Sequence, residues 1–249
     1  MRASPASPGA DPSMRQAALV AGLAMLAMAA LAPVANFGVL GKLIVPGDAK
    51  ATTDHVLASE GAFRFALCAL LVVAILDVVV TWAFYVLMKP VSQAVSLLAA
   101  WLRIAYTATF AAALADLAKV LVLLDGEPSR KAFDAGQLQA QVALQLDAFR
   151  SQWMVSLGIF GVHLLVLGAL MLRSGYVPRL VGLLVFAAGA GYSADTFAHI
   201  LLPHQSAAVS KVTLWLFLGE ISLIVWPLWR GIRGFDEKVG RPDPHGLDP

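Results

Sequence analysis

The sequence contains little charge and only one cysteine. Charged residues make up 14% of the 249 residues and hydrophobic residues 59%, and the mean hydropathy is +0.76. Soluble domains have an apolar share of about 45–50%, so this composition is typical of an integral membrane protein. The single Cys68 excludes an intramolecular disulfide, and a net charge of +2 provides no basic patch for nucleic acid. The partner that the composition predicts is therefore the lipid bilayer.

Common enzyme motifs are also absent from the sequence. It contains no nucleophile elbow, no HExxH and no CxxC motif. Each of these motifs places a nucleophile or metal ligands at a spacing that its chemistry requires. We therefore predict no resident cofactor, and we favour a non-enzymatic protein over an enzyme.

Long apolar segments divide the chain into six predicted membrane spans. About 20 apolar residues are needed to cross a bilayer as an α-helix. Such segments occur at roughly 16–36, 65–88, 91–124, 153–172, 180–202 and 212–229. We predict an all-α, polytopic bundle of six transmembrane helices over residues 14–235. The Pro-rich residues 1–13 and the polar residues 236–249 are predicted to be disordered tails.

Two polar segments interrupt the apolar pattern. Residues 38–61 carry too many charges to span, and we predict an ordered loop with a short helix there. In residues 125–150, glutamine and apolar residues largely alternate, which would favour a strand. Gln, Leu and Ala are nevertheless good helix formers, and the run leads directly into the fourth span. We therefore predict a surface helix that precedes this span.

The distribution of basic residues predicts the orientation. Six spans place both termini on one side, and the short loops on that side contain Lys89, Arg173 and Arg179 without any acid. Short loops rich in Lys and Arg remain in the cytoplasm. We therefore expect a multi-pass protein of the bacterial inner membrane with both termini in the cytoplasm.

Two charges lie inside the second and third spans. Asp77 and Arg103 are each 13 positions from Pro90 in the connecting turn. At about 1.5 Å per helical residue, both lie roughly 20 Å from the turn. A lone charge at this depth costs on the order of 3 kcal/mol. The sequence therefore predicts an intramembrane ion pair between Asp77 and Arg103.

Further polar residues occur in the later spans. Tyr192, Asp195 and His199 follow one another at offsets of three and seven, so they share one side of the fifth span. Counting from the neighbouring turns places His163 and Glu220 at one depth. Lipid would penalise these groups, so we expect them to face a protein interior.

The polar residues allow three interpretations. They are hydrogen-bonded pairs that only fix helix packing, or a site for an unidentified small ligand, ion or proton formed by His163, Tyr192, Asp195 and Glu220. The third is a zinc-dependent intramembrane hydrolase in which His163, Asp195 and His199 bind the metal and Glu220 is the base. Among these functions we favour ligand, ion or proton binding.

Several stretches also carry a resemblance to a known family. They are KLIVPGD at 42–48, ASEGAFR at 58–64, YVLMKPV at 85–91, GVHLLVLG at 161–168 and RSGYVPR at 173–179, with Asp77, Gly191-Tyr192, Asp195 and Gly219-Glu220. In this order they resemble the bacterial integral membrane family called domain of unknown function 4386, over residues 14–234. The resemblance implies a multi-span bacterial membrane protein. It brings no activity or site residues, and His199 matches none of its motifs.

Overall fold

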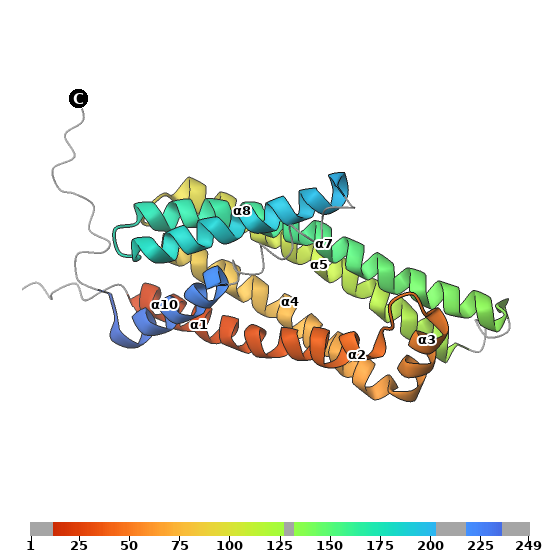
Figure 1. Ribbon diagram of the computed structural model, residues 1–249. Helices are drawn as coiled ribbons and strands as arrows, with labels where there is room; N and C mark the ends of the chain where they lie inside the picture. Colours follow the sequence, from red (N-terminus) through yellow and green to blue (C-terminus); the bar gives the residue numbers. More distant parts are fainter. Residues whose placement is uncertain (1–11, 127–131, 203–217, 236–249) are drawn as a thin grey trace, which may run out of the picture.

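The computed structural model describes residues 12–126, 132–202 and 218–235, and every regular element in these ranges is a helix (Figure 1). In chain order they are α1 (Pro12–Pro33), η1 (Val34–Leu40), α2 (Gly41–Leu43), α3 (Ala49–Ala58), α4 (Glu60–Met88), α5 (Gln93–Asp125), α7 (Ala135–Arg173), α8 (Arg179–Leu201) and α10 (Leu218–Arg233). The prediction of an all-α chain is confirmed for these residues.

Within the described residues, five helical segments are long and apolar enough to cross a membrane. They are Ser13–Leu43, Glu60–Met88, Gln93–Asp125, Ala135–Arg173 and Arg179–Leu201. The predicted sixth span, 212–229, begins outside the described residues, and α10 covers its remainder. Residues 1–11 and 236–249 of the predicted tails also lie outside the described residues.

The first span continues further than the sequence pattern indicated. Its α-helical part ends at Pro33, and the π-helical segment η1 and the short α2 carry it on to Leu43. Proline has no backbone N–H, so Pro33 cannot donate to the Ala29 carbonyl one turn earlier. The Asn36 side chain donates to the Ala32 carbonyl at 3.1 Å and satisfies one backbone acceptor there.

The predicted short helix in the 38–61 loop is α3. Gly47 adopts a φ of 79° before it, and the Asp48 side chain accepts a hydrogen bond from the backbone N–H of Ala51. A glycine in this left-handed conformation avoids the penalty that a side chain would impose. The Thr52 hydroxyl then contacts both the N–H and the carbonyl of Val45, at 2.9 and 3.2 Å.

The predicted surface helix and fourth span form one continuous helix, α7. Asp134 caps its start, and Gln137 returns the hydrogen bond in a capping box. The 39 residues extend about 58 Å, roughly twice the thickness of a hydrocarbon core. No proline interrupts the sequence between these residues, so the helix has no reason to end at the membrane boundary.

The helices pack through close backbone approaches. Helix α4 contacts α1 and α5, α7 packs between α5 and α8, and α10 lies against α1 and α8 (Figure 1). A Cβ added to Gly168 of α7 would lie 2.6 Å from the backbone nitrogen of Phe186 of α8, so this crossing requires glycine.

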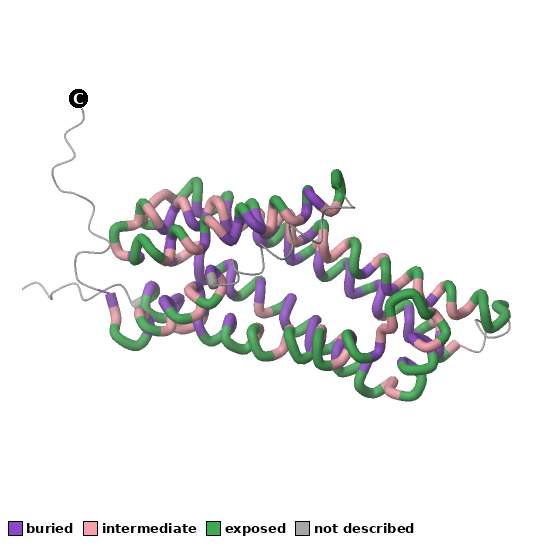
Figure 2. Tube along the Cα trace, viewed as in Figure 1, coloured by how far each residue is buried: buried purple, intermediate pink, exposed green. Residues whose placement is uncertain are grey.

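The outward faces of the helices are apolar. Exposed residues follow the outer faces, whereas buried residues line the helix contacts (Figure 2). Large exposed apolar side chains on α4 and α8 include Leu71, Ile75, Trp82, Leu183 and Phe197. So much exposed apolar surface fits contact with lipid better than contact with water.

Candidate functional site

Asp77 of α4 and Arg103 of α5 meet inside the helix bundle. Each is only 1% exposed. Arg103 donates from Nε at 3.0 Å and from Nη2 at 2.5 Å, and both bonds go to Oδ1 of Asp77. A charge-assisted contact of this kind offsets part of the cost of burying each charge.

His163 of α7 is the third member of this cluster. Its Nδ1 lies 2.8 Å from the Ala99 carbonyl, and its Nε2 lies 3.4 Å from Nη1 of Arg103. A carbonyl can only accept, so these partners assign the proton to Nδ1 and leave Nε2 to accept from the guanidinium. His163 is therefore a neutral group that positions Arg103, and both of its nitrogens are occupied.

The Phe160 ring of α7 connects the cluster to further aromatic residues. The guanidinium carbon of Arg103 lies 5.4 Å from the ring centre, which is a cation–π distance. The rings of Tyr106 and Tyr192 lie 4.8 and 5.6 Å from it, centre to centre. Phe160 thus links α5 to α8, and its spacing of three from His163 is the sequence signal that would have identified it.

Glu220 of α10 and Tyr192 of α8 form the other part of the polar core. The Tyr192 hydroxyl donates to Oε1 of Glu220. The two parts together contain two carboxyl groups, a single guanidinium and a neutral histidine.

Asp195 and His199 form a local pair on α8. Nδ1 of His199 lies 2.9 Å from the backbone carbonyl of Asp195 and 3.6 Å from its Oδ1. Within the described residues, no three His, Cys, Asp or Glu side chains gather in an arrangement that could hold a metal ion. The zinc ligands that the sequence suggested, His163, Asp195 and His199, are thus not brought together.

A second polar contact joins α5 and α7 nearer the α3 end of the bundle. Lys119 lies 2.6 Å from Oδ1 of the buried Asp116, and Gln152 donates to Oδ2 of the same carboxylate. The Lys119 side chain is 59% exposed, as expected when a lysine extends its ammonium toward water.

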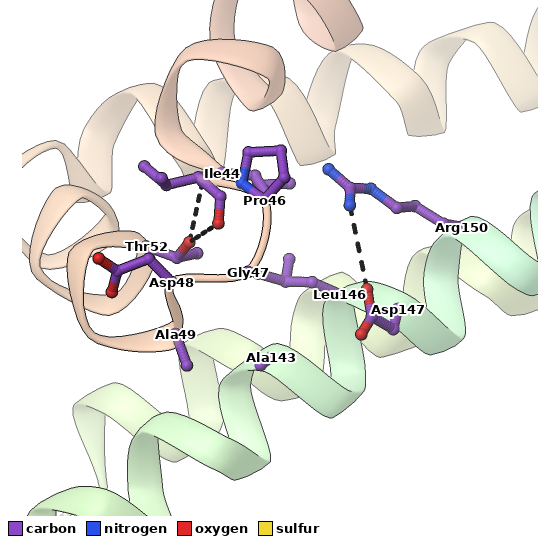
Figure 3. Close-up of a pocket in the computed structure, with 11 residues that line it drawn as sticks. Ile44, Pro46, Gly47, Asp48, Ala49, Thr52, Ala143, Leu146, Asp147 and Arg150 are labelled. Carbon is purple, nitrogen blue, oxygen red and sulfur yellow. Dashed lines mark hydrogen bonds and ion pairs between the residues drawn. The ribbon is translucent and has the colours of Figure 1, made fainter.

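A cavity of about 210 Å³ lies between the 44–49 loop and α7 (Figure 3). Its charged lining residues on α7, Asp147 and Arg150, are 72% and 47% exposed and their closest charged atoms are 3.9 Å apart. An exposed pair at this distance is weak, so this cavity offers no strongly organised binding group.

In the part of the chain that the structure describes, the fold and the polar core define a helical protein with five candidate membrane-spanning helices and a buried ion pair. The chain belongs to the family Domain of unknown function (DUF4386), whose model matches residues 20–231. An uncharacterised protein of Archaeoglobus fulgidus is 31% identical over 178 residues, which cover 72% of this chain and 90% of that protein. No solved structure matches the chain.

Proposed function

We propose that the chain is a six-span protein of the bacterial cytoplasmic membrane with both termini in the cytoplasm. Arg15, near the start of α1, donates to the carbonyls of Gly231 and Ile232 at the end of α10, at 3.0 and 3.3 Å. Adjacent first and last helix ends support an even number of crossings. The acid-free loops around Lys89 and Arg173 support the cytoplasmic location of this end.

We infer that the polar core of this protein binds one proton or one small monovalent cation. The observation that carries this inference is the second carboxyl group. Arg103 already balances Asp77, so an ionised Glu220, which is half-buried, would add a negative charge that no ion pair among the described residues balances. Such a charge costs on the order of 3 kcal/mol even on lenient scales, and one bound proton or cation removes it.

The geometry favours a small positive ligand over the other interpretations. Asp77, Arg103 and His163 contact one another directly, so a larger ligand would have to displace them. Among the described residues the zinc hydrolase has no assembled ligand set, and His163 uses both nitrogens within the protein. A purely structural core would leave an ionised Glu220 with the Tyr192 hydroxyl as a donor but with no ion pair among the described residues.

Infrared spectroscopy of the protein in nanodiscs tests this function. If a proton is bound, the wild type has a protonated-carboxyl band at neutral pH that shifts in D2O and is absent from Glu220→Gln. Asp116→Asn is the matched control, because Asp116 is also buried but is paired with Lys119, and this variant keeps the band.

If a cation is bound instead, sodium at constant ionic strength raises the thermal stability of the wild type but not of Glu220→Gln. The proposal fails if neither the band nor the sodium response depends on Glu220. The structural interpretation would then account for the core.

A further inference from the structure

Six of the described basic residues gather at one end of the helix bundle. The start of α1, the α4–α5 turn, the α7–α8 turn and the end of α10 lie together there (Figure 1). The six residues are Arg15, Lys89, Arg173, Arg179, Arg230 and Arg233. Arg230 is half-buried and the other five are exposed, and none of the described residues in the two turns or in α10 after Glu220 is Asp or Glu. This end of the bundle therefore presents a surface rich in positive charge.

Hydrogen bonds to backbone carbonyls hold these four segments together. Tyr176, in the α7–α8 turn, donates from its hydroxyl to the carbonyl of Leu87 at the end of α4. Arg230 of α10 donates to the carbonyl of Tyr176 at 3.4 Å. Arg15 of α1 donates to the carbonyl of Gly231 at 3.0 Å. The fold, and not the order of the residues in the chain, thus brings the basic residues together.

The exposed ring of Trp229 holds two of the arginines in one place. The guanidinium carbons of Arg230 and Arg233 each lie 5.3 Å from the centre of this ring. The guanidinium carbon of Arg230 also lies 5.4 Å from the centre of the Phe235 ring. All three are cation–π distances. Two like charges held against one ring repel each other, so an anion that contacts both is favoured.

An apolar stripe runs along α10 toward these arginines. Ile221, Val225, Trp229 and Ile232 follow one another at offsets of four, eight and eleven, which places them on one side of the helix. Their side chains are between 43% and 67% exposed. The acyl chain of a lipid can cover such a stripe, whereas a soluble anion has no apolar part with which to do so.

We propose that this end of the bundle binds one phospholipid whose headgroup carries a net negative charge. Its phosphate contacts Arg230 and Arg233 beside Trp229, its acyl chains lie along the α10 stripe, and Arg173 and Arg179 add attraction from the neighbouring turn. Basic residues at a membrane surface attract anionic lipids, and tryptophan is enriched at the membrane interface. The inference rests on the proposed membrane location but not on the ligand of the polar core.

Titration of the full chain with lipid in a neutral detergent tests this site. Native mass spectrometry measures the affinity for phosphatidylglycerol, and phosphatidylcholine, which has the same phosphate but no net charge, is the reference lipid. We expect phosphatidylglycerol to bind more tightly, and Arg233→Gln to weaken its binding about fivefold, as for the loss of one basic residue near an anionic lipid.

Arg150→Gln is the charge-matched control for Arg233→Gln. Arg150 is also exposed, and it lies about 35 Å from Arg173 along α7, toward the opposite end of the bundle. This variant should keep the wild-type affinity for phosphatidylglycerol.

Trp229→Leu separates an organised site from diffuse surface charge. It leaves the net charge unchanged and keeps an apolar side chain, but it removes the ring that positions both arginines. We expect phosphatidylglycerol to bind about two- to fivefold more weakly, as for the loss of an exposed cation–π contact. Trp101→Leu, at an exposed position of α5, is the matched control and leaves the affinity unchanged.

Three results would overturn the proposal. The first is equal affinity for phosphatidylglycerol and phosphatidylcholine. The second is an equal loss of affinity in a variant and in its matched control, because binding then follows overall charge or apolar surface. The third is displacement of the lipid by inorganic phosphate at constant ionic strength, which identifies a site for a soluble anion. The infrared test of Glu220 does not depend on these results, so the two proposals can fail separately.

A cross-linking measurement on the unmutated chain covers a failure of either variant to fold. Phosphatidylglycerol that carries a photoreactive group in its acyl chain should label α10 between Ile221 and Ile232. Labels confined to α4 and α5, or spread evenly over the outer faces of all the helices, contradict the proposed site.

Discussion

Removing Arg103 tests the buried ion pair most directly. In Arg103→Leu, the Asp77 carboxylate remains 1% exposed but loses both of its hydrogen bonds, and His163 loses the donor to Nε2. Breaking a buried pair from one side costs about 3–5 kcal/mol, because the remaining charge has no compensation. We expect a loss of this size in the free energy of unfolding.

The double variant Asp77→Asn with Arg103→Leu separates charge from packing. It removes both charges and leaves only neutral polar groups without hydrogen-bond partners, which cost about 1–3 kcal/mol. The double variant should therefore be more stable than Arg103→Leu by about 2 kcal/mol, or roughly 30-fold in the folding equilibrium. Unfolding in mixed micelles with increasing denaturing detergent, followed by circular dichroism, measures the difference.

Arg64→Leu is the matched control for these variants. Arg64 also pairs with acids, Glu60 and Asp125, but its side chain is 48% exposed, so its loss should change stability very little. A double variant as unstable as Arg103→Leu would refute the ion-pair reasoning, and so would an equal loss in Arg64→Leu.

Two further predictions concern packing and pH. Gly168→Ala places a Cβ 2.6 Å from the backbone nitrogen of Phe186, and it should lower the free energy of unfolding by about 1–3 kcal/mol. A Cβ added to Gly61 would have no atom within 4 Å, so Gly61→Ala should be neutral or slightly stabilising in the same assay. Burial raises the pKa of Tyr176, in the turn between α7 and α8, above its ordinary value of 10.0. Above pH 10 the unfolded chain therefore loses a proton that the native state keeps, so stability falls as pH rises, and Tyr176→Phe should flatten this fall in pH-dependent unfolding curves. An unchanged slope, or a Gly168→Ala variant as stable as Gly61→Ala, would contradict these expectations.

The depth of Asp77 and Arg103 was predictable because both belong to one hairpin. The turn at Pro90 gives a common starting point, and the rise per residue then gives the level of each side chain along its helix. The partner of His163 was more difficult to predict, since it depends on how α7 is rotated about its own axis against α5. Helical spacing shows which residues share a side, but it does not show which neighbouring helix that side meets. The zinc set fails for this reason, because His163 faces Arg103 on α5, whereas Asp195 pairs with His199 within α8.

The ends of helices were predictable where proline or a cap marked them. The α4–α5 turn contains Pro90, and α5 begins beside the capping side chain of Ser92, so the expected boundary was close to the observed one. By contrast, α7 carries no such signal where it leaves the apolar region. Its extension beyond the expected span follows from good helix formers between Asp134 and Trp153.

The sequence alone determined that this chain is helical, strongly apolar and divided into long segments. These properties are local, because in lipid each helix must satisfy its own backbone hydrogen bonds. The length and hydropathy of a segment are therefore enough to identify a membrane-spanning helix. Only the tertiary structure decided which faces meet, since helices in lipid associate through close packing and specific polar contacts between residues far apart in the chain. Gly168 against Phe186, Phe160 against Arg103 and Tyr192 on Glu220 are contacts of this kind. They bring Arg103 against Phe160 and Glu220 against Tyr192, an arrangement that appears only when α5, α7, α8 and α10 are assembled.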